Sequence, residues 1–161
     1  MDTESIVGFQ RDIFLNLHHI VFSKYTVKIM SEKIASIIGS TGMIGIYLQE
    51  QLLQDNYFDT VRVLVRRPQE KTNEKLEVKL INFDDAESVK IALEGSDTIF
   101  SCIGTTQRNV KGDKELYRKI DFEIPANTAR WGKEIGCKKW VMITSVNANP
   151  ASSTFYLKLK G

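Results

Sequence analysis

The segment from Ile37 to Gly45, IIGSTGMIG, constrains the fold of this chain more than any other. An apolar run from Ile34 to Ile38 leads into three glycines with the spacing GxxGxxG, and a helical pattern of apolar residues follows at once. A dinucleotide pyrophosphate requires this order of strand, glycine turn and helix, because the helix N-terminus then offers free N–H groups. A flexible loop is the alternative interpretation, and the matching flanks favour the nucleotide site.

The three glycines have separate predicted roles. Gly39 allows the tight turn, and Gly42 lets the backbone approach the phosphates without a Cβ in the way. Gly45 lets the helix pack closely on the strand. The turn therefore predicts a phosphate-binding loop at the first strand–helix junction.

Composition limits the remaining possibilities. A chain of 161 residues is long enough for one domain with a substantial core and too short for two comfortable ones. The net charge is +2 and the basic residues are scattered, so neither nucleic acid nor a membrane surface is a predicted partner. Two cysteines make no disulfide framework, which favours a reducing compartment and leads us to predict a cytoplasmic location.

Residues 1–30 differ from the rest of the chain. The apolar stretch from Ile13 to Phe22 is interrupted by polar residues and is too short to span a bilayer. Asp2 and Glu4 stand where a secretory signal carries positive charge. We consider either an N-terminal extension, poorly ordered or forming an extra helix, or translation that starts at Met30. We favour the second, because a start at Met30 places the first strand where nucleotide-binding folds usually begin.

The histidines do not predict a metal site, and the cysteines do not predict a catalytic nucleophile. His18 and His19 are adjacent, so they do not share a helix face, and no other ligands accompany them. Cys102 ends a predicted strand, but it has no histidine partner outside residues 1–30 and is interpreted as a small buried thiol.

Strand-like and helix-like segments alternate along residues 31–161, the predicted nucleotide-binding domain. Strands are expected at 34–38, 61–65, 78–83, 98–103 and 140–144. Helices are expected at 43–54, 84–93 with Asp84 or Asp85 as N-cap, 114–123, from Pro125 to 134, and 154–160. Pro125 is expected to end or kink the third of these helices. The alternation predicts an α/β fold with a Rossmann-type, doubly wound parallel sheet.

The end of the second predicted strand indicates which dinucleotide binds. NAD-binding versions of this fold have an Asp or Glu there for the ribose 2′-hydroxyl, whereas this chain has Arg66 and Arg67. A guanidinium suits a 2′-phosphate, because its geometry and fixed charge match phosphate oxygens. A solvated strand end is the alternative interpretation, and the position of the pair favours NADP(H) over NAD(H).

Candidate catalytic residues follow the fifth predicted strand. Ser145 closes that strand at the edge of the sheet where this architecture binds ligands. Tyr156 and Lys160 form a YxxxK pair and share one helix face. A nearby ammonium favours the phenolate, so the tyrosine could act as an acid or base near neutral pH.

Together with GSTGMIG, these motifs resemble the short-chain dehydrogenase/reductase superfamily, most closely its atypical NAD(P)-binding members of the Tat-interacting-protein type. The resemblance runs from about Ile34 to Gly161. It includes the Arg66-Arg67 pair, CIGTT at 102–106, the segment from Lys119 to Ser145, and the closing YLKLKG.

The resemblance implies a role for each site residue. Tyr156 would be the acid/base, Ser145 would hydrogen-bond the reacting carbonyl or hydroxyl, and Lys160 would hold the nicotinamide ribose. Asp121 is interpreted as a helix-surface acid, and the asparagine of the family's proton relay is not evident. The implied cofactor-binding residues are Gly39, Ser40, Thr41, Gly42, Met43, Ile44, Gly45, Arg66, Arg67, Gly104, Thr105, and Asn82 where many members have an adenine-binding aspartate.

Similar proteins continue beyond the YxxxK motif, so the sheet is expected to be incomplete at its C-terminal side, with the fifth strand as an apolar edge. We therefore carry three hypotheses. The first is an NADP(H)-dependent oxidoreductase, or part of one, that acts on a small-molecule carbonyl or hydroxyl. The second is a non-catalytic NAD(P)H-binding sensor, and the third is a remnant without a stable fold. An epimerase or dehydratase of nucleotide sugars, a homo-oligomer, and activity of the chain on its own are left open.

Overall fold

A five-stranded parallel sheet with the order β3-β2-β1-β4-β5 forms the centre of the fold. The computed structural model describes residues 32–161, so the predicted extension at 1–30, with His18 and His19, lies outside the described residues. The strands are β1 (Ile34–Ile38), β2 (Thr60–Val65), β3 (Leu76–Leu80), β4 (Thr98–Ser101) and β5 (Lys139–Met142). The helical segments are α2 (Met43–Gln54), α3 (Ala86–Leu93), α4 (Lys114–Arg118), η1 (Lys119–Glu123), α5 (Ile124–Glu134) and α6 (Phe155–Lys160). The predicted Rossmann-type α/β fold is confirmed.

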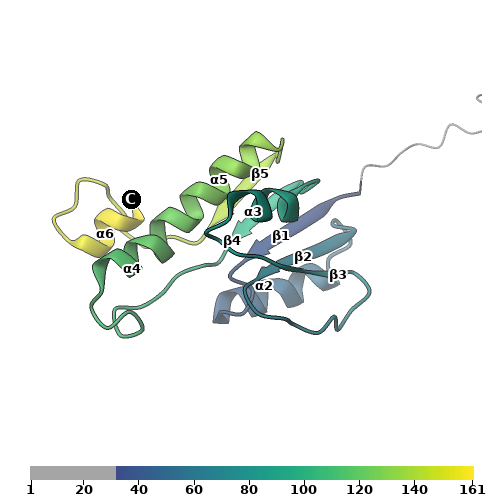
Figure 1. The fold of residues 1–161 in the computed structure, drawn as a ribbon, viewed down its shortest axis with the longest axis horizontal. Helices are drawn as coiled ribbons and strands as arrows, with labels where there is room; N and C mark the ends of the chain where they lie inside the picture. The colour runs from purple at the N-terminus through teal and green to yellow at the C-terminus, as the bar shows by residue number, and fades with distance from the viewer. Residues whose placement is uncertain (1–31) are drawn as a thin grey trace, which may run out of the picture. The chain divides into compact units, whose positions relative to one another are not determined.

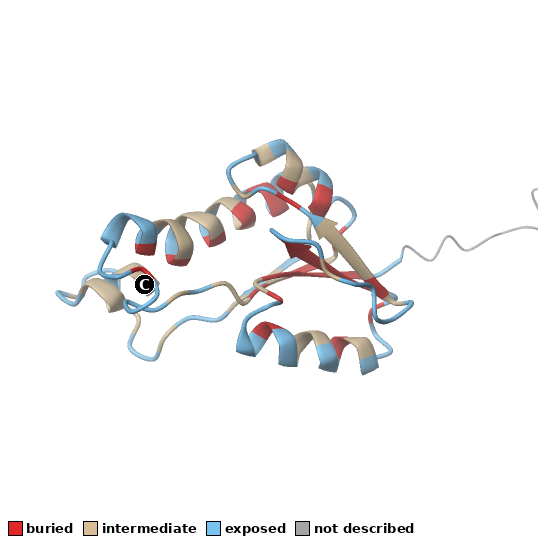
Figure 2. Ribbon diagram, turned by 60° about the horizontal axis from the view of Figure 1, so that its bottom comes forward, coloured by how far each residue is buried: buried red, intermediate tan, exposed pale blue. Residues whose placement is uncertain are grey.

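Helices cover both faces of the sheet (Figures 1 and 2). Helix α2 lies on one face, and α3 and α5 lie on the other. The central strands are rich in Ile and Val and are buried on both sides, as parallel sheets require. Two apolar clusters result, one between α2 and the sheet around Ile37 and Val63, the other beneath α3 and α5 around Leu93 and Ile99.

The pairing register explains where three strands depart from their predicted bounds. Strand β3 begins at Leu76 and ends at Leu80, because its register with β2 matches Leu76 to Val61 and Leu80 to Val65. The predicted strand at 78–83 was therefore placed too late. Strands β4 and β5 are also shorter than predicted, and their last residues, Ser101 and Met142, are register partners.

Helix α2 has the predicted bounds, and α3 begins after its N-cap Asp85, whose carboxylate accepts the Glu87 and Ser88 N–H groups. Pro125 does not end the helical run, which was one of the two predicted effects. The chain stays helical from Lys114 to Glu134, because Pro125 falls in the first turn of α5, where its missing N–H is tolerated.

The wider π-helical turn η1 joins α4 to α5. In this turn the Ile124 N–H donates to the Lys119 carbonyl, five residues earlier.

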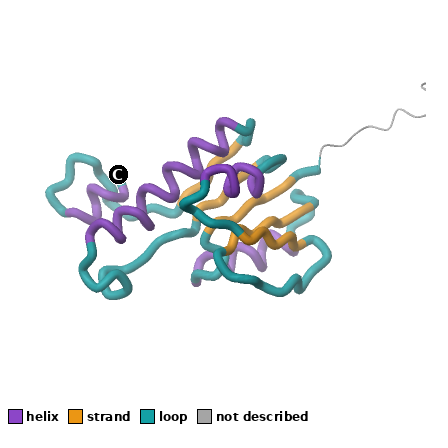
Figure 3. Tube along the Cα trace, viewed as in Figure 1, coloured by secondary structure: helices purple, strands orange, loops and turns teal. Residues whose placement is uncertain are grey.

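All five strands end at the same edge of the sheet, because they are parallel. The loops after β4 and β5 leave from this edge and lead to α4 and α6, which lie beyond it (Figure 3). Strand β5 is the edge strand on that side, as predicted, and Val141 is 43% exposed. Within residues 32–161, no helix is long and apolar enough to span a bilayer.

Candidate functional site

The glycine turn packs directly against the exit of β4. Gly39 has φ +82°, and a Cβ there would lie 2.6 Å from the Ile103 nitrogen and 2.7 Å from the Cys102 carbonyl carbon. A Cβ on Gly45 would overlap the Gly39 carbonyl oxygen, which also accepts the Gly42 N–H at 3.1 Å. Glycine is therefore required at 39 and 45 for the β1–α2 junction to close in this form.

The N-terminus of α2 is available to an anion. Its N-cap is Gly42, which supplies no side chain, and its first turn contains no acidic residue. The Ser40 hydroxyl beside it is buried and has no hydrogen-bond partner among the described residues. Thr41, Met43 and Ile44 are exposed next to these groups. The turn thus combines unpaired backbone N–H donors, one unpaired hydroxyl and a positive dipole end.

Arg66 and Arg67 follow β2 and are exposed, and neither forms an ion pair with another described residue. Asn82 lies just beyond β3, the strand paired with β2. Its Oδ1 accepts the Asp84 N–H at 3.0 Å, and its side chain is otherwise exposed. The predicted adenosine-side residues therefore lie on neighbouring strands at the carboxyl edge of the sheet.

Asp121 is buried, so the prediction of a helix-surface acid is wrong. Its Oδ1 lies 2.6 Å from the Lys160 Nζ, and the two side chains are only 1% and 8% exposed. Its Oδ2 accepts the Thr105 N–H at 2.8 Å. The π-helical turn carries Asp121 toward α6, and the ion pair and hydrogen bond offset the cost of burying a charge.

Tyr117 is a site residue that the sequence interpretation missed. Its ring stacks on the Tyr156 ring, with centroids 6.4 Å apart and an interplanar angle of 14°. Burial, followed by the nearby charges of Asp121 and Tyr156, raises the pKa of the Tyr117 phenol. The sequence did contain a signal for this residue. Tyr117 and Asp121 are an aromatic and a charged residue four positions apart, as Tyr156 and Lys160 are, and in the structure the two pairs face each other.

The β4 exit completes the cluster. Gly104 approaches the ion pair so closely that a Cβ there would lie 3.4 Å from the Asp121 Oδ1 and 3.9 Å from the Lys160 Nζ. The structure therefore brings together three predicted site residues, Gly104, Thr105 and Lys160, and one that was not predicted, Asp121.

Ser145 is half-buried at the end of the segment that follows β5, and its hydroxyl donates to the Val146 carbonyl at 3.1 Å. The neighbouring Thr144 hydroxyl donates to the Lys160 carbonyl at 2.9 Å, which ties this segment to α6. No hydrogen bond joins Ser145 to Tyr156 within residues 32–161.

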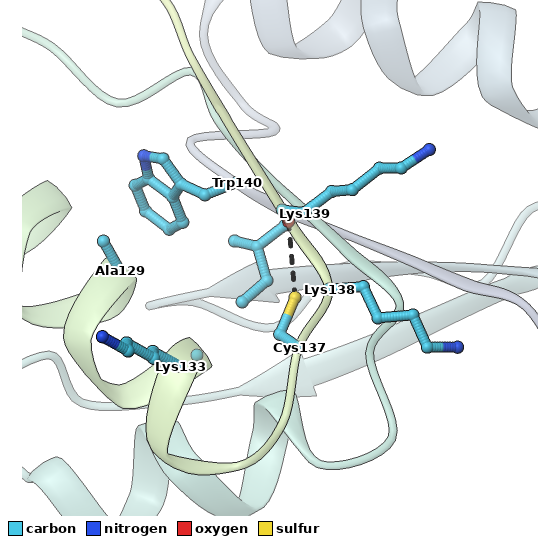
Figure 4. Close-up of a pocket in the computed structure, with 8 residues that line it drawn as sticks. Ala129, Lys133, Cys137, Lys138, Lys139 and Trp140 are labelled. Carbon is cyan, nitrogen blue, oxygen red and sulfur yellow. Dashed lines mark hydrogen bonds between the residues drawn. The ribbon is translucent and has the colours of Figure 1, made fainter.

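Two small pockets flank α5. One, of about 140 Å³, adjoins the ion pair and is lined by Asp121, Lys160 and the apolar residues Phe122, Pro125, Ala126, Ala129, Trp140, Met142, Leu159 and Gly161. The other lies at the opposite, amino end of β5, between Lys133 and Trp140, and contains none of the predicted site residues (Figure 4). In it, the Cys137 thiol contacts the Lys139 carbonyl at 3.4 Å.

Cys102 is half-buried beside the glycine turn, and burial raises the pKa of its thiol. A raised pKa disfavours the thiolate that a nucleophile needs. Cys102 packs against the apolar cluster on the α2 side, although it is only partly buried and not the buried thiol that was predicted.

Comparison with known proteins gives a consistent picture. Residues 39–159 match a family described as NAD(P)H-binding. The chain is 37% identical over 130 residues to Protein FMP52, mitochondrial, from Debaryomyces hansenii, covering 79% of this chain and 56% of that protein. It is 29% identical over 135 residues to Protein HTATIP2 from Rattus norvegicus, covering 82% of this chain and 55% of that protein. The structure of MoeE5 in complex with UDP-glucuronic acid and NAD has a TM-score of 0.65 at 16% identity, covering 78% of this chain and 45% of that one.

The chain spans about half the length of the curated relatives it matches. The predicted cytoplasmic location is wrong, because the FMP52 relatives are named mitochondrial. The prediction rested on the lack of a disulfide framework, which does not single out the cytoplasm.

Proposed function

The chain belongs to the NAD(P)H-binding family, as an atypical member of the short-chain dehydrogenase/reductase superfamily, and on this premise we propose that its glycine turn binds the pyrophosphate of NADP(H). The turn itself carries the proposal. Gly39 and Gly45 stand where there is no room for a Cβ. The turn leads into the N-terminus of α2, which has no side-chain cap. The unpartnered Ser40 hydroxyl supplies a further donor for a phosphate oxygen.

Arg66 and Arg67 support NADP(H) over NAD(H). Both are exposed at the carboxyl end of β2, beside the central strand that leads into the glycine turn. A 2′-phosphate at this end would accept charge-assisted hydrogen bonds from one or both guanidinium groups. Asn82, at the end of β3, would then contact the adenine.

Titration of the chain with NADPH and separately with NADH, followed by quenching of Trp131 and Trp140 fluorescence, tests the cofactor proposal. We expect NADPH to bind more tightly. Arg66→Gln combined with Arg67→Gln should weaken NADPH about tenfold to a hundredfold and leave NADH nearly unchanged. Arg130→Gln, an exposed change on α5, is the matched control. Failure of both dinucleotides to bind a folded chain would reject the proposal.

We further propose that Ser145, Tyr156 and Lys160 serve an oxidoreductase reaction on a small-molecule carbonyl or hydroxyl. A bound nicotinamide would supply or accept the hydride. Tyr156 would give a proton to the carbonyl oxygen during reduction or take it from the hydroxyl during oxidation, and Ser145 would donate a hydrogen bond to that oxygen. Support comes from α6, which carries Tyr156 and Lys160 four residues apart on one helix face.

Hydride transfer from NADPH to a panel of aldehydes and ketones tests this step through the loss of NADPH absorbance. Tyr156→Phe should abolish turnover and leave NADPH affinity within about twofold, because the phenol acts on the substrate oxygen. Normal turnover by Tyr156→Phe would contradict the assigned role.

A non-catalytic NAD(P)H-binding sensor is the second candidate. The observation that favours it is the direct ion pair between Lys160 and Asp121, which neutralises the ammonium next to Tyr156. This candidate predicts NADPH binding without turnover on the same panel, and it predicts that Tyr156→Phe changes nothing.

A further inference from the structure

The segments that follow β4 and β5 carry an excess of positive charge that the proposed reaction leaves without a role. We propose that this charge selects a substrate bearing an anionic group, a carboxylate or a phosphate, and that Lys114 is the specificity-determining residue that contacts it. The proposal rests on the oxidoreductase function proposed above for Ser145 and Tyr156.

Basic residues outnumber acidic ones at this end of the molecule. The chain as a whole is nearly balanced, with 22 basic and 20 acidic residues. Segments 102–114 and 143–161 leave from the edge where the strands end and lead to α4 and α6 (Figure 3). Their charged residues are Arg108, Lys111, Lys114, Lys158 and Lys160, with Asp113 as the one acid. The basic residues look scattered in the sequence, and the fold brings these five to one end.

The acids of the same region do not neutralise Lys114. Asp113 is the N-cap of α4, where its carboxylate accepts a backbone N–H at 3.0 Å. Asp121 already pairs with Lys160. Glu115 follows Lys114 directly on α4, and side chains at adjacent helical positions do not face each other. Among residues 32–161, none forms an ion pair with Lys114.

Lys114 lies beside the proposed catalytic tyrosine. Its ammonium is 5.8 Å from the centre of the Phe155 ring. Tyr117, one turn further along the same helix, packs on both Phe155 and Tyr156, with ring centroids 5.9 and 6.4 Å apart. Lys114 itself is exposed, so its ammonium is open to a ligand. A substrate whose reacting oxygen contacts Tyr156 therefore has a free cation on the same side.

The loop after β4 presents two further cations on an ordered backbone. Its turn is closed by a hydrogen bond of 2.9 Å from the Asp113 N–H to the Val110 carbonyl, and Val110 is buried. Lys111 has φ +51°, a left-handed conformation that costs a lysine more than it costs a glycine. Arg108 and Lys111 are exposed, and neither is paired with a described acid. These cations strengthen the field that draws an anion toward Lys114.

The phosphates of the proposed cofactor do not account for this charge. The pyrophosphate is assigned to the N-terminus of α2, and the 2′-phosphate to Arg66 and Arg67 after β2. Strand β1 leads into the glycine turn, with β2 on one side of it and β4 and β5 on the other. Lys114 belongs to the β4 side. An anion that binds there comes from a second molecule, which in the proposed reaction is the substrate.

Reduction of matched aldehydes by NADPH tests the proposal. The three isomers of carboxybenzaldehyde place a carboxylate at different distances from the carbonyl, and their methyl esters are neutral. We expect one acid or more to have a KM about tenfold below that of its ester, because hydrogen bonds to charged groups are strong. The formylphenyl phosphates, paired with the neutral methoxybenzaldehydes, show whether phosphate is preferred to carboxylate. Equal KM values within every pair would overturn the proposal.

Lys114→Gln should raise the KM of the preferred anionic aldehyde about tenfold. The KM of its neutral partner and both kcat values should stay within about twofold, because the ammonium binds the substrate without entering the reaction. Lys133→Gln removes the same charge from the last turn of α5, near the amino end of β5, and is the matched control. A Lys114→Gln variant that changes both aldehydes equally, or neither, would overturn the proposal.

The salt dependence of the unaltered chain tests the same point without a variant. Contacts between exposed charges are screened by salt, and Lys114 is exposed. The ratio of the neutral to the anionic KM should therefore fall toward one between about 0.05 and about 0.5 M NaCl. A ratio that stays constant over this range would overturn the proposal.

A binding measurement separates failure of the proposal from failure of the proposed function. The alcohol products, the hydroxymethylbenzoates, do not react when NADPH is bound, because the nicotinamide is already reduced. Calorimetry should show that the preferred isomer binds the NADPH complex about tenfold more tightly than its methyl ester, and that Lys114→Gln removes this difference.

If NADPH binds and no aldehyde is reduced, the oxidoreductase function has failed, and the calorimetric comparison still decides on the anion site. Equal affinities for every acid and its ester, or no binding of either, would overturn the proposal in that case. If NADPH does not bind, the cofactor titration shows it directly, and both the proposed function and this proposal are rejected.

Discussion

The β1–α2 region and the β5–α6 region carry the two halves of the candidate site, and they are built differently. Every residue of β1 is buried, and β1 has a neighbouring strand on each side. No residue of β5 is buried, and among the described strands β5 pairs with β4 alone. Helix α6 is held by an ion pair, a ring stack and hydrogen bonds such as that from Thr144.

This difference indicates how each half of the site is fixed. The glycine turn, proposed to bind phosphate, takes its shape from the core, since that shape follows from the close approach of β1, α2 and the β4 exit. The candidate catalytic residues depend instead on a few polar and aromatic contacts. Substitutions should therefore affect the two regions to very different extents.

The largest effect is expected at Gly39. Gly39→Ala should lower the free energy of unfolding by about 2–5 kcal/mol, through the cost of a left-handed backbone and the overlap with the β4 exit. Gly112 has the same φ of +82°, and nothing within 4 Å would meet a Cβ there. Gly112→Ala should cost only about 1–2 kcal/mol. Urea unfolding of both variants measures the difference, and equal losses would show that the close packing at Gly39 is unimportant.

A smaller effect is expected for truncation of strand side chains. Val63→Ala removes two methyl groups from a fully buried site on β2 and should cost about 2–3 kcal/mol. Val141→Ala makes the same change on β5, where the side chain is 43% exposed, and should cost about 0.5 kcal/mol or less. Denaturant midpoints of the two variants measure the two losses. A loss for Val141→Ala as large as that for Val63→Ala would mean that β5 is covered.

The same experiment bears on the third hypothesis drawn from the sequence. A cooperative unfolding transition in the unaltered chain would exclude a remnant that has no stable fold.

An effect smaller than those at Gly39 and Val63 is expected at Asp97, which connects the two regions. Its carboxylate accepts the Ile34 N–H at the start of β1 and pairs with Lys138 beside β5 at 2.8 Å. The hydrogen bond from Lys138 lowers the pKa of Asp97, with help from the Ile34 N–H and against the effect of burial. Asp97→Asn should therefore cost about 0.5–1 kcal/mol at pH 7.

The sign of the pH dependence follows from the lowered pKa. A carboxyl group whose pKa is lower in the folded chain stabilises it above the unfolded value, about pH 4, and this stabilisation is lost as the pH falls further. The difference between the unaltered chain and Asp97→Asn should therefore shrink between about pH 4 and pH 2. Unfolding free energies at a series of pH values measure it. A difference that stays constant into strong acid would show that the Asp97 charge does not contribute.

The sequence predicted the fold class and the helix at 43–54 because their signals are local. The apolar run before Gly39 and the periodicity after Gly42 each specify one element without reference to the rest of the chain. The bounds of β3 could not be predicted in this way, because they are set by the register with β2. The helical run does not end at Pro125, as the sequence allowed, because this residue falls in the first turn of a new helical segment.

The candidate site was predictable only in part for the same reason. The glycine turn is contiguous, so its geometry could be inferred from spacing alone. The burial of Asp121 depends on α6 lying against η1, a contact between residues 39 positions apart in the chain. Tyr156 and Lys160 lie on α6, and Ser145 follows β5 after a gap of two residues, so it does not close that strand directly as predicted. The proposed roles of all three residues stay predictions.

Because of the π-helical turn, the residues before it, which include Tyr117, can be rotated about the helix axis without moving the part of α5 that packs on the sheet. One extra residue in the turn between Lys119 and Ile124 rotates everything before it by about 100° relative to α5. Deleting a single residue there would restore an ordinary α-helix and leave the packing of α5 on the sheet in place. Tyr117 would then point away from α6 and the carboxylate of Asp121 would no longer meet Lys160. A one-codon deletion would therefore separate the cluster at Lys160 from the packing of α5 on the sheet.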